Sequence, residues 1–337
     1  MIFLKNDYSL GAHPRILTAL SNTNMMHTNG YGLDPFCEES KALLRSRIAD
    51  NDADIHFLAG GTQTNMTAIA AFLRPHHAVL AADSGHVSVH ETGAIEATGH
   101  KVFLLPSVDG KILPEKIREA VQFHKDEHMV KPKLVYISDS TEIGTIYTKE
   151  ELKALRRDCD DLNLYLYMDG ARLGCALTAP GNDLSLSDVA RLTDAFYIGG
   201  TKNGAMFGEA LVILKDALKE DFRYHIKQRG GMLAKGRFLG IQFLELFKDD
   251  LYFELARHAN KMADILRQGI AGGGYTFFSS SPTNQLFPVF PDMLTDHLAA
   301  QTAFEVWSKA GERDTVVRLV TSWGTSEEEV TAFLKSL

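Results

Sequence analysis

The alternation of short apolar runs with helical patterns between residues 55 and 214 constrains the fold more than any other feature of this sequence. The apolar runs are as long as buried strands and lie at 55–58, 78–81, 102–105, 134–137, 164–168, 195–198 and 210–214. Helical patterns separate several of them, at 66–73, 113–123 and 149–158. Strands that alternate with helices are typical of a mostly parallel sheet covered by helices on both faces. The sequence therefore predicts an α/β fold.

Polar groups follow these runs at the points where the expected strands end. They are residues 60–65, His86, Glu142, the pair Asp169 and Arg172, and Lys202. In open α/β sheets the ligand binds beyond the carboxyl ends of the strands. We therefore expect these groups to share one site.

Lys202 stands in a Gly-Gly-Thr-Lys-Asn-Gly turn between two apolar runs. Most lysines are exposed, so this stretch alone also fits a lysine on the rim of the protein. Burial between two strands would lower the pKa of the amine from about 10.4 and make the amine a nucleophile. A lysine that forms a Schiff base requires this property.

The expected groups match what pyridoxal 5′-phosphate (PLP) requires of a protein. Free backbone N–H groups at a strand-to-helix turn would bind its phosphate, and the turn offers Gly61, Thr62 and Gln63. Asp169 would pair with the pyridine nitrogen, and His86 would stack on the ring. Lys202 would form the internal aldimine.

Each group also has an ordinary structural explanation. Residues 60–65 could cap a helix, Asp169 could be a helix N-cap, and Arg172 could form a surface ion pair. Most histidines, likewise, have no catalytic part. A nucleotide-binding protein is disfavoured, because the glycine turn has neither a Walker lysine nor a GxGxxG pattern. Only the joint occurrence of the groups at strand ends favours PLP.

The chain is longer than one hydrophobic core usually supports, so we expect two domains. Residues 1–35 are rich in turn formers and are expected to be irregular and to wrap over the protein. A long helical region with a bend near Asp249-Asp250 is expected at 238–270, followed by short strands and helices. The predicted division is a large PLP-binding domain, 1–245 with the N-terminal segment, and a small α+β domain, 246–337.

A net charge of −8 without a long basic run argues against nucleic acid or an anionic membrane as a partner. No stretch is long and apolar enough for a membrane helix, and the start lacks the pattern of a signal peptide. The three cysteines are far apart and fit reduced thiols. These features predict a soluble, cytoplasmic protein. Its histidines are scattered, so no metal site is expected.

The sequence resembles the threonine aldolase/β-eliminating lyase family of fold-type I PLP enzymes. The resemblance rests on Asp-Gly-Ala-Arg-Leu at 169–173 with Lys202, on Gly-Thr-Gln-Thr-Asn at 61–65, and on His86 with Glu91. The segments 4–8, 31–35 and 317–322 fit as well. The resemblance implies the aspartate aminotransferase fold of type I and a homodimer or homotetramer. It also implies retro-aldol cleavage of threonine, allo-threonine or phenylserine to glycine and an aldehyde.

The resemblance also implies roles for individual residues. Arg172, which would also contact the cofactor, and Arg318 would bind the substrate carboxylate, and Asn6 and Tyr31 would contribute to substrate binding. His86 would be the base that takes the β-hydroxyl proton.

Three departures from the family pattern affect the expected substrate preference more than cofactor use. Glu142 replaces a histidine that many threonine aldolases carry, so it is a second candidate base or a hydrogen-bonding residue. Asn6 replaces a common serine, and Lys227 only loosely matches the family's basic segment. The alternatives are a β-eliminating or C–S lyase on the same scaffold, and a non-catalytic protein that binds PLP or an amino acid.

Overall fold

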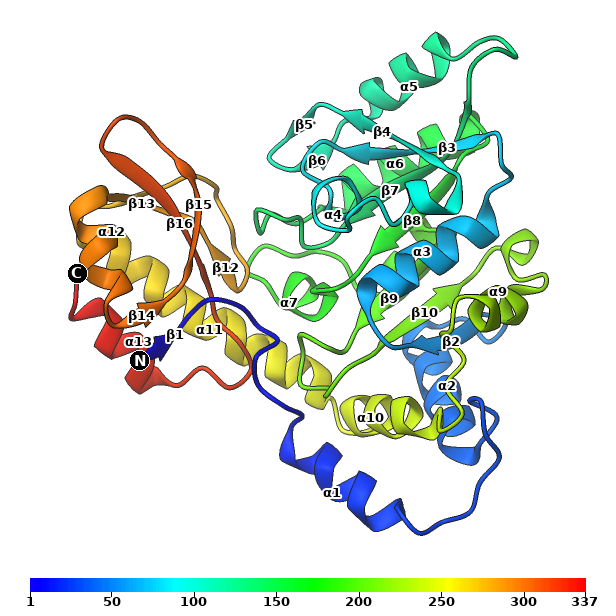
Figure 1. The fold of residues 1–337 in the computed structure, drawn as a ribbon, viewed down its shortest axis with the longest axis horizontal. Coiled ribbons are helices and arrows are strands. Elements are labelled where there is room, and N and C mark those ends of the chain that lie inside the picture. Colours follow the sequence, from blue (N-terminus) through cyan, green and yellow to red (C-terminus); the bar gives the residue numbers. More distant parts are fainter.

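A seven-stranded sheet of order β2-β10-β9-β8-β7-β3-β4 is the centre of the larger unit in a computed structural model that describes residues 1–337 (Figure 1). Its strands are β2 (Asp54–Leu58), β3 (His77–Ala82), β4 (Lys101–Leu105), β7 (Lys131–Ser138), β8 (Tyr165–Asp169), β9 (Ala195–Gly199) and β10 (Glu209–Ile213). Only β10 runs antiparallel to its neighbours. The expected strands are present, and the predicted α/β class with a mostly parallel sheet is confirmed.

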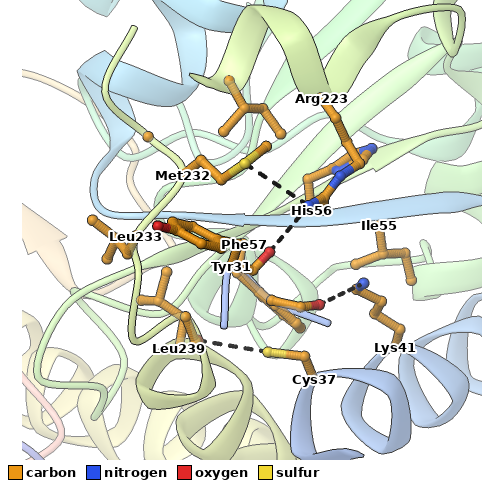
Figure 2. A pocket seen from close by; sticks show the side chains of 14 residues that line it. Tyr31, Cys37, Lys41, Ile55, His56, Phe57, Arg223, Met232, Leu233 and Leu239 are labelled. Carbon is orange, nitrogen blue, oxygen red and sulfur yellow. Dashed lines mark hydrogen bonds between the residues drawn. The ribbon is translucent and has the colours of Figure 1, made fainter. Parts of the chain in front are cut away.

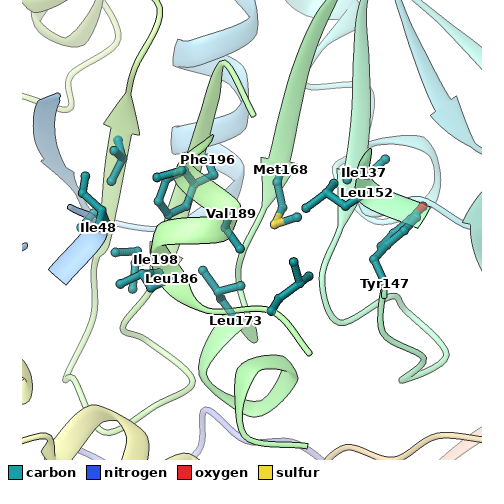
Figure 3. Packing of buried hydrophobic residues seen from close by; sticks show 14 of the residues in the cluster. Ile48, Ile137, Tyr147, Leu152, Met168, Leu173, Leu186, Val189, Phe196 and Ile198 are labelled. Carbon is teal, nitrogen blue, oxygen red and sulfur yellow. The ribbon is translucent and has the colours of Figure 1, made fainter. Parts of the chain in front are cut away.

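Both faces of this sheet are buried, which explains why its strands are nearly continuous apolar runs. Neighbouring residues point to opposite faces of a strand, so Leu80 and Phe196 join one apolar cluster while Val79 and Tyr197 join another. Figure 3 shows part of the first cluster, where strand side chains meet those of the covering helices.

Helices cover the two faces of the sheet unequally. The first cluster is closed by α2 (Pro35–Ile48), α5 (Pro114–Phe123), α6 (Lys149–Asp161), α8 (Leu186–Leu192) and α10 (Arg237–Phe247). The second is closed by α3 (Gly61–Phe72) and α9 (Phe222–Gln228). Smaller elements complete the unit: α4 (His86–Val89), α7 (Leu173–Leu177), the hairpin β5 (Ser107–Val108) and β6 (Lys111–Ile112), and 3₁₀ turns at Glu96–Thr98 and Asp216–Leu218.

Helix α3 begins five residues before the start expected from the apolar pattern. Residues 61–65, predicted to be a loop, form its first turns. Thr64 and Asn65 are buried polar residues, of which Asn65 donates to Asp169, and they conceal the helical period that apolar residues would have shown. The start of α3 therefore belongs to the wall of the site.

The N-terminal segment is more regular than expected. Helix α1 (Pro14–Thr23) begins with a proline, which suits a first helical position, and packs on α10. Strand β1 (Ile2–Phe3) pairs with β14 (Thr302–Ala303), so the first residues lie in the C-terminal unit and not with the large domain (Figure 1). No local pattern could indicate this pairing, because it joins opposite ends of the chain.

The C-terminal unit is a second sheet backed by helices. Its strands are β11 (Thr276–Phe277), β12 (Gln285–Leu286), β13 (Pro288–Pro291), β15 (Glu305–Lys309) and β16 (Asp314–Val320), and its helices are α12 (Asp292–Ala299) and α13 (Glu327–Leu334). None of the helices in the chain combines the length and the apolar character that crossing a membrane requires.

Helix α11 (Leu251–Gly272) joins the two units. The helical region expected at 238–270 is divided between α10 and α11, where Asp250 takes the left-handed conformation with φ 59°. Tyr252 near the start of α11 packs in the large core, and Leu266 near its end packs in the small one. The division of the chain at residue 245 stays a prediction.

Candidate active site

A cavity of about 300 Å³ opens at the carboxyl ends of β7, β8 and β9. A second cavity of similar volume continues from it toward β15 and β16 of the C-terminal unit. Tyr8, His86, Glu142, Arg172 and Lys202 line both. The inner cavity adds Gly61, Thr62 and Asp169, and the outer adds Arg318. The structure thus brings most of the predicted site residues to one place.

Asp169 ends β8 at the floor of the inner cavity. Tyr136 Oη and Asn65 Nδ2 donate to its Oδ2 at 2.6 and 2.9 Å, and Tyr197 Oη donates to Oδ1 at 2.5 Å. Burial opposes ionisation, but the nearby His86 and these hydrogen bonds hold the pKa of Asp169 below its ordinary value. Asp169 therefore keeps a negative charge inside the protein. The sequence did not indicate the two tyrosines, because both lie in strands that read as apolar core.

His86 begins α4 and is oriented by a buried acid. Its Nδ1 lies 2.8 Å from Oε1 of Glu91, which also accepts a hydrogen bond from Asn65 Nδ2 at 2.8 Å. A carboxylate only accepts, so Nδ1 carries the proton and Nε2 is left as the acceptor of the ring. Asn65 thus connects the histidine's partner to Asp169.

Lys202 lies at the cavity wall in the loop after β9. Burial lowers the pKa of its amine, as does the nearby Arg172, while Asp7, Asp169 and Glu209 act in the opposite direction. Glu209 was not identified from the sequence. It accepts from the Gly200 N–H and the Thr201 hydroxyl, and burial raises its pKa to about 7.

Arg172 and Arg318 both reach the outer cavity, and each already has an acidic partner. Arg172 donates from Nε and Nη2 to Asp7 at 2.7 and 3.1 Å. Arg318 on β16 contacts Glu305 at 2.9 Å and lies over the Trp307 ring. The Asp7 pairing was not predicted, since it joins residues 165 positions apart.

Glu142 lies beside His86 in the loop after β7. Its Oε1 accepts from the His86 backbone N–H at 3.0 Å and from Ser138 Oγ at 2.8 Å. Burial raises the pKa of Glu142, although the Ser138 hydrogen bond acts against this shift. A carboxyl group with a raised pKa next to an oriented histidine is a candidate for proton transfer.

Three predicted residues lie outside the two cavities. Gln63 accepts from the Ala59 N–H and donates to the carbonyl oxygen of Arg229, so its side chain fastens the start of α3. Asn6 lines a separate hollow and accepts from the Tyr8 N–H, and Tyr8 lines the site instead.

Tyr31, the third of these residues, lies by a small cavity of about 30 Å³ between α2, β2 and the segment after α9 (Figure 2). Its ring is exposed and lies 4.9 Å from Lys227 Nζ. Within one chain neither Tyr31 nor Lys227 reaches the candidate site.

The first turn of α3 can hold an anion. Its cap, Gly60, makes no side-chain hydrogen bond, so the first N–H groups of the helix keep no partner within it. A Cβ on Gly61 would come within 3.0 Å of Tyr197 Oη, and glycine therefore keeps this wall open. With the buried charge of Asp169 and the amine of Lys202, the cavity fits PLP. No group of three or more His, Cys, Asp or Glu side chains is arranged to hold a metal ion.

Comparisons with known proteins agree with this geometry. The family model of the β-eliminating lyases matches residues 12–292. The low specificity L-threonine aldolase of Pseudomonas aeruginosa is 32% identical over 331 residues, which cover 97% of this chain and 94% of that protein. The structure of a Leishmania major threonine aldolase matches with a TM-score of 0.98 at 49% identity, covering 99% of this chain and 98% of that one.

A more distant structure, an aspartate aminotransferase of Thermus thermophilus, matches with a TM-score of 0.75 at 18% identity and covers 100% of this chain and 90% of that one. It shows that the predicted aspartate aminotransferase fold is correct. The resemblance inferred from the motifs is likewise confirmed along nearly the whole chain. The protein belongs to the β-eliminating lyase family, in its threonine aldolase branch.

Proposed function

We propose that the protein is a PLP-dependent aldehyde-lyase that cleaves β-hydroxy-α-amino acids of the threonine, allo-threonine or phenylserine type to glycine and an aldehyde. The observation that carries this proposal is the meeting of Lys202, Asp169 and the first turn of α3 around one cavity. Family membership supports it, because the relatives named above are threonine aldolases.

The chain's own groups would hold PLP at its separate ends. The N–H groups at the start of α3 would bind the phosphate, with Gly61 and Thr62 lining its place. Asp169 would pair with the ring nitrogen, and Lys202 would hold the cofactor covalently through its amine. PLP, when bound, supplies a protonated ring that accepts the electron pair left on Cα as the Cα–Cβ bond breaks.

Arg172 and Arg318 would bind the α-carboxylate of the substrate from the outer cavity. A planar guanidinium fixes a carboxylate by direction as well as by charge, so it orients the bond that is to break. Both arginines lie beside Lys202, where the substrate amine must arrive.

His86 and Glu142 are the groups that would take the proton of the β-hydroxyl. Glu91 holds Nδ1 of His86, so Nε2 can accept a proton. Burial raises the pKa of Glu142, which makes its carboxylate a stronger base than an exposed glutamate. The flat ring of His86 would also stack on the cofactor.

Product analysis distinguishes this activity from the alternatives. PLP-loaded protein incubated with threonine or allo-threonine should give glycine and acetaldehyde. A β-eliminating lyase would give a 2-oxo acid and ammonia, and a binding protein would give no product. Either result would contradict the proposal.

The role of Lys202 has a spectroscopic test. We expect Lys202→Ala to lose the visible absorbance of lysine-bound PLP and at least ~10³-fold in kcat, because no other amine lines the cavity. Lys153→Ala, which removes a surface lysine paired with Glu150, is the matched control and should change neither. Unchanged absorbance in Lys202→Ala would show that another residue holds the cofactor.

We also infer a homodimer or homotetramer. The segment around Tyr31 exposes Met25, Met26 and Leu33 as well, and a second copy of the chain would cover these apolar side chains.

A further inference from the structure

Asp7 is a buried carboxylate that the catalytic roles described so far do not use. Asp7 is 3% exposed. Arg172 lines both cavities and Asp7 lines neither, so Asp7 lies behind Arg172 as seen from the cavities. Its Oδ2 accepts from Arg172 Nε at 2.7 Å and its Oδ1 from Arg172 Nη2 at 3.1 Å. Two parallel bonds of this kind fix the plane of a guanidinium group as well as its position.

The pairing with Asp7 leaves one side of Arg172 free. The hydrogen bonds of the Arg172 side chain within the chain go from Nε and Nη2 to Asp7, and none comes from Nη1. Arg172 lines both cavities beside Lys202. The free N–H groups of Arg172 are thus available at the place where an amino acid must put its carboxylate.

Asp7 is itself held firmly from the C-terminal unit. Asn284 Nδ2 donates to Asp7 Oδ2 at 2.9 Å and to the carbonyl oxygen of Thr321 at 2.8 Å. The backbone N–H of Val320 bonds to the carbonyl oxygen of Leu4 at 2.8 Å, which fastens the segment that carries Asp7. The carboxylate therefore has a fixed position when a ligand arrives.

The partner of the second arginine is held less firmly. Glu305 is half-buried and makes one ion pair with Arg318, at 2.9 Å. It also lines the outer cavity, where a ligand could displace it. Asp7 lies on the far side of Arg172 and does not compete with a ligand. Asp7 is therefore a fixed support for Arg172, whereas Glu305 is a partner that a ligand could displace from Arg318.

We propose that Asp7 is a positioning residue for substrate binding: it aims the Arg172 guanidinium at the α-carboxylate and balances its charge beside Lys202, without touching the substrate. The proposal rests on the proposed function in one respect, namely that an α-amino acid binds at this cavity.

Asp7 also affects the electrostatics of Lys202. Burial and the charge of Arg172 lower the pKa of the amine, whereas Asp7, Asp169 and Glu209 raise it. The other titratable or charged groups that line the cavities with Lys202 are His86, Glu142, Glu305 and Arg318. Removal of the Asp7 charge would leave Arg172 uncompensated. The nitrogen of Lys202 would then release its proton at lower pH.

The test compares Asp7→Asn with Asp194→Asn in PLP-loaded protein. Asp194 is also a buried partner of an arginine, Arg156 at 2.8 Å, but it lies away from the cavity. We expect Asp7→Asn to weaken glycine binding by about 10- to 100-fold, because the guanidinium group of Arg172 is no longer held in one orientation. Glycine binding is followed through the visible spectrum. When the visible spectrum of the PLP-loaded protein is titrated with pH, the pH of the midpoint should be lower in Asp7→Asn than in the wild type. Asp194→Asn should lower the melting temperature and change neither readout.

A second variant covers the case in which Asp7→Asn does not fold. Asn284→Ala keeps the charge of Asp7 but removes one of its anchors, so glycine binding should weaken by about three- to tenfold with an unchanged titration midpoint. With threonine, both variants should raise KM more than they lower kcat. Glycine binding as tight as in the wild type, in either variant, would overturn the proposal.

These readouts separate this proposal from the proposed function. Glycine binding and the spectral titration do not require cleavage of threonine. A protein that binds glycine through Asp7-aimed Arg172 but releases no acetaldehyde would contradict only the aldolase assignment. A protein that cleaves threonine with unchanged glycine binding in Asp7→Asn would contradict only the role of Asp7.

Discussion

Glu142 is the residue whose protonation state would affect the proposed reaction most directly. It contacts the backbone of His86, and burial raises its pKa. A base works only when unprotonated, so kcat/KM should increase as pH rises through this raised pKa. We expect Glu142→Gln to remove this limb of the pH profile and to lower kcat by about 10²–10⁴-fold.

The measurement is kcat/KM for threonine between about pH 5 and pH 9, the range in which a histidine or a perturbed carboxyl group titrates. His86→Asn provides the comparison. If Glu142→Gln keeps the acidic limb and His86→Asn loses it, His86 is the base and Glu142 only a hydrogen-bonding residue.

Asp139 is a buried acid beside the site, and its ionisation affects the stability of the fold. Burial raises its pKa from 3.8 to about 8, so the folded protein holds a proton that the unfolded chain releases. Because the folded-state pKa is the higher one, this residue lowers the stability of the fold as pH rises from about 4 toward 8.

Asp139→Asn cannot ionise and should escape this loss. We expect its melting temperature to be close to that of the wild type near pH 4.5 and to exceed it increasingly toward pH 8, by an amount equivalent to a few kcal/mol. Thermal unfolding across this pH range measures the difference. Parallel curves for the two proteins would show that Asp139 ionises normally in the fold.

The site residues that could be predicted are those with a local signal. Lys202 stands in a glycine-rich turn, and Asp169 ends an apolar run, so strand and turn patterns locate both. Asp7 and Tyr136 gave no such signal. Asp7 acquires its role from an arginine far along the chain, and Tyr136 is one more apolar residue until its hydroxyl meets Asp169.

At the scale of elements, buried strands were the most predictable part of this fold. Each of the seven strands of the large sheet falls on an apolar run. In central strands such as β9 and β10 the cause is burial on both faces, which leaves few positions for polar residues, whereas the edge strand β4 keeps Leu104 exposed. Helix starts that face the site were less predictable. Polar residues occupy buried positions in the first turns of α3, among them Thr64 and Asn65, so the period that reveals a helix is lost there.

The break between α10 and α11 shows what a pattern of apolar residues leaves open. The apolar period continues through it, although the helix stops at Phe247 and restarts at Leu251. The change of direction comes from Asp250, which has a left-handed backbone conformation. Aspartate tolerates this conformation better than most residues do. The sequence predicted a helical region with a bend near Asp249-Asp250, and the structure turns that bend into a break between two helices.

At the scale of the whole molecule, the site depends on a joint between the two units. The loop after β7 that carries Glu142 is bonded to the segment before β12: Ser279 Oγ donates to the carbonyl oxygen of Ile143, and Thr283 Oγ1 to that of Gly144. The Gln285 side chain donates to the carbonyl oxygen of Thr141. The C-terminal unit thereby fixes the loop that carries Glu142.

Gly144 is the residue through which this joint can be tested. Its φ is +80°, and a Cβ there would overlap the Ser281 side chain and come within 3.0 Å of the Gln285 carbonyl oxygen. Gly181 is the matched control, because its φ is +83° but nothing lies within 4 Å of the position of a Cβ. Gly181→Ala should cost only the strain of a left-handed alanine, about 1–2 kcal/mol.

Gly144→Ala should cost that strain and also the displacement of the segment before β12, about 2–4 kcal/mol in all. Since the displaced loop carries Glu142, kcat should fall as well, whereas Gly181→Ala should keep it. Urea unfolding and threonine cleavage measure the two effects. If Gly144→Ala behaved like Gly181→Ala in both measurements, the contact between the two units would shift without cost. The position of Glu142 would then have to be set by the large unit alone.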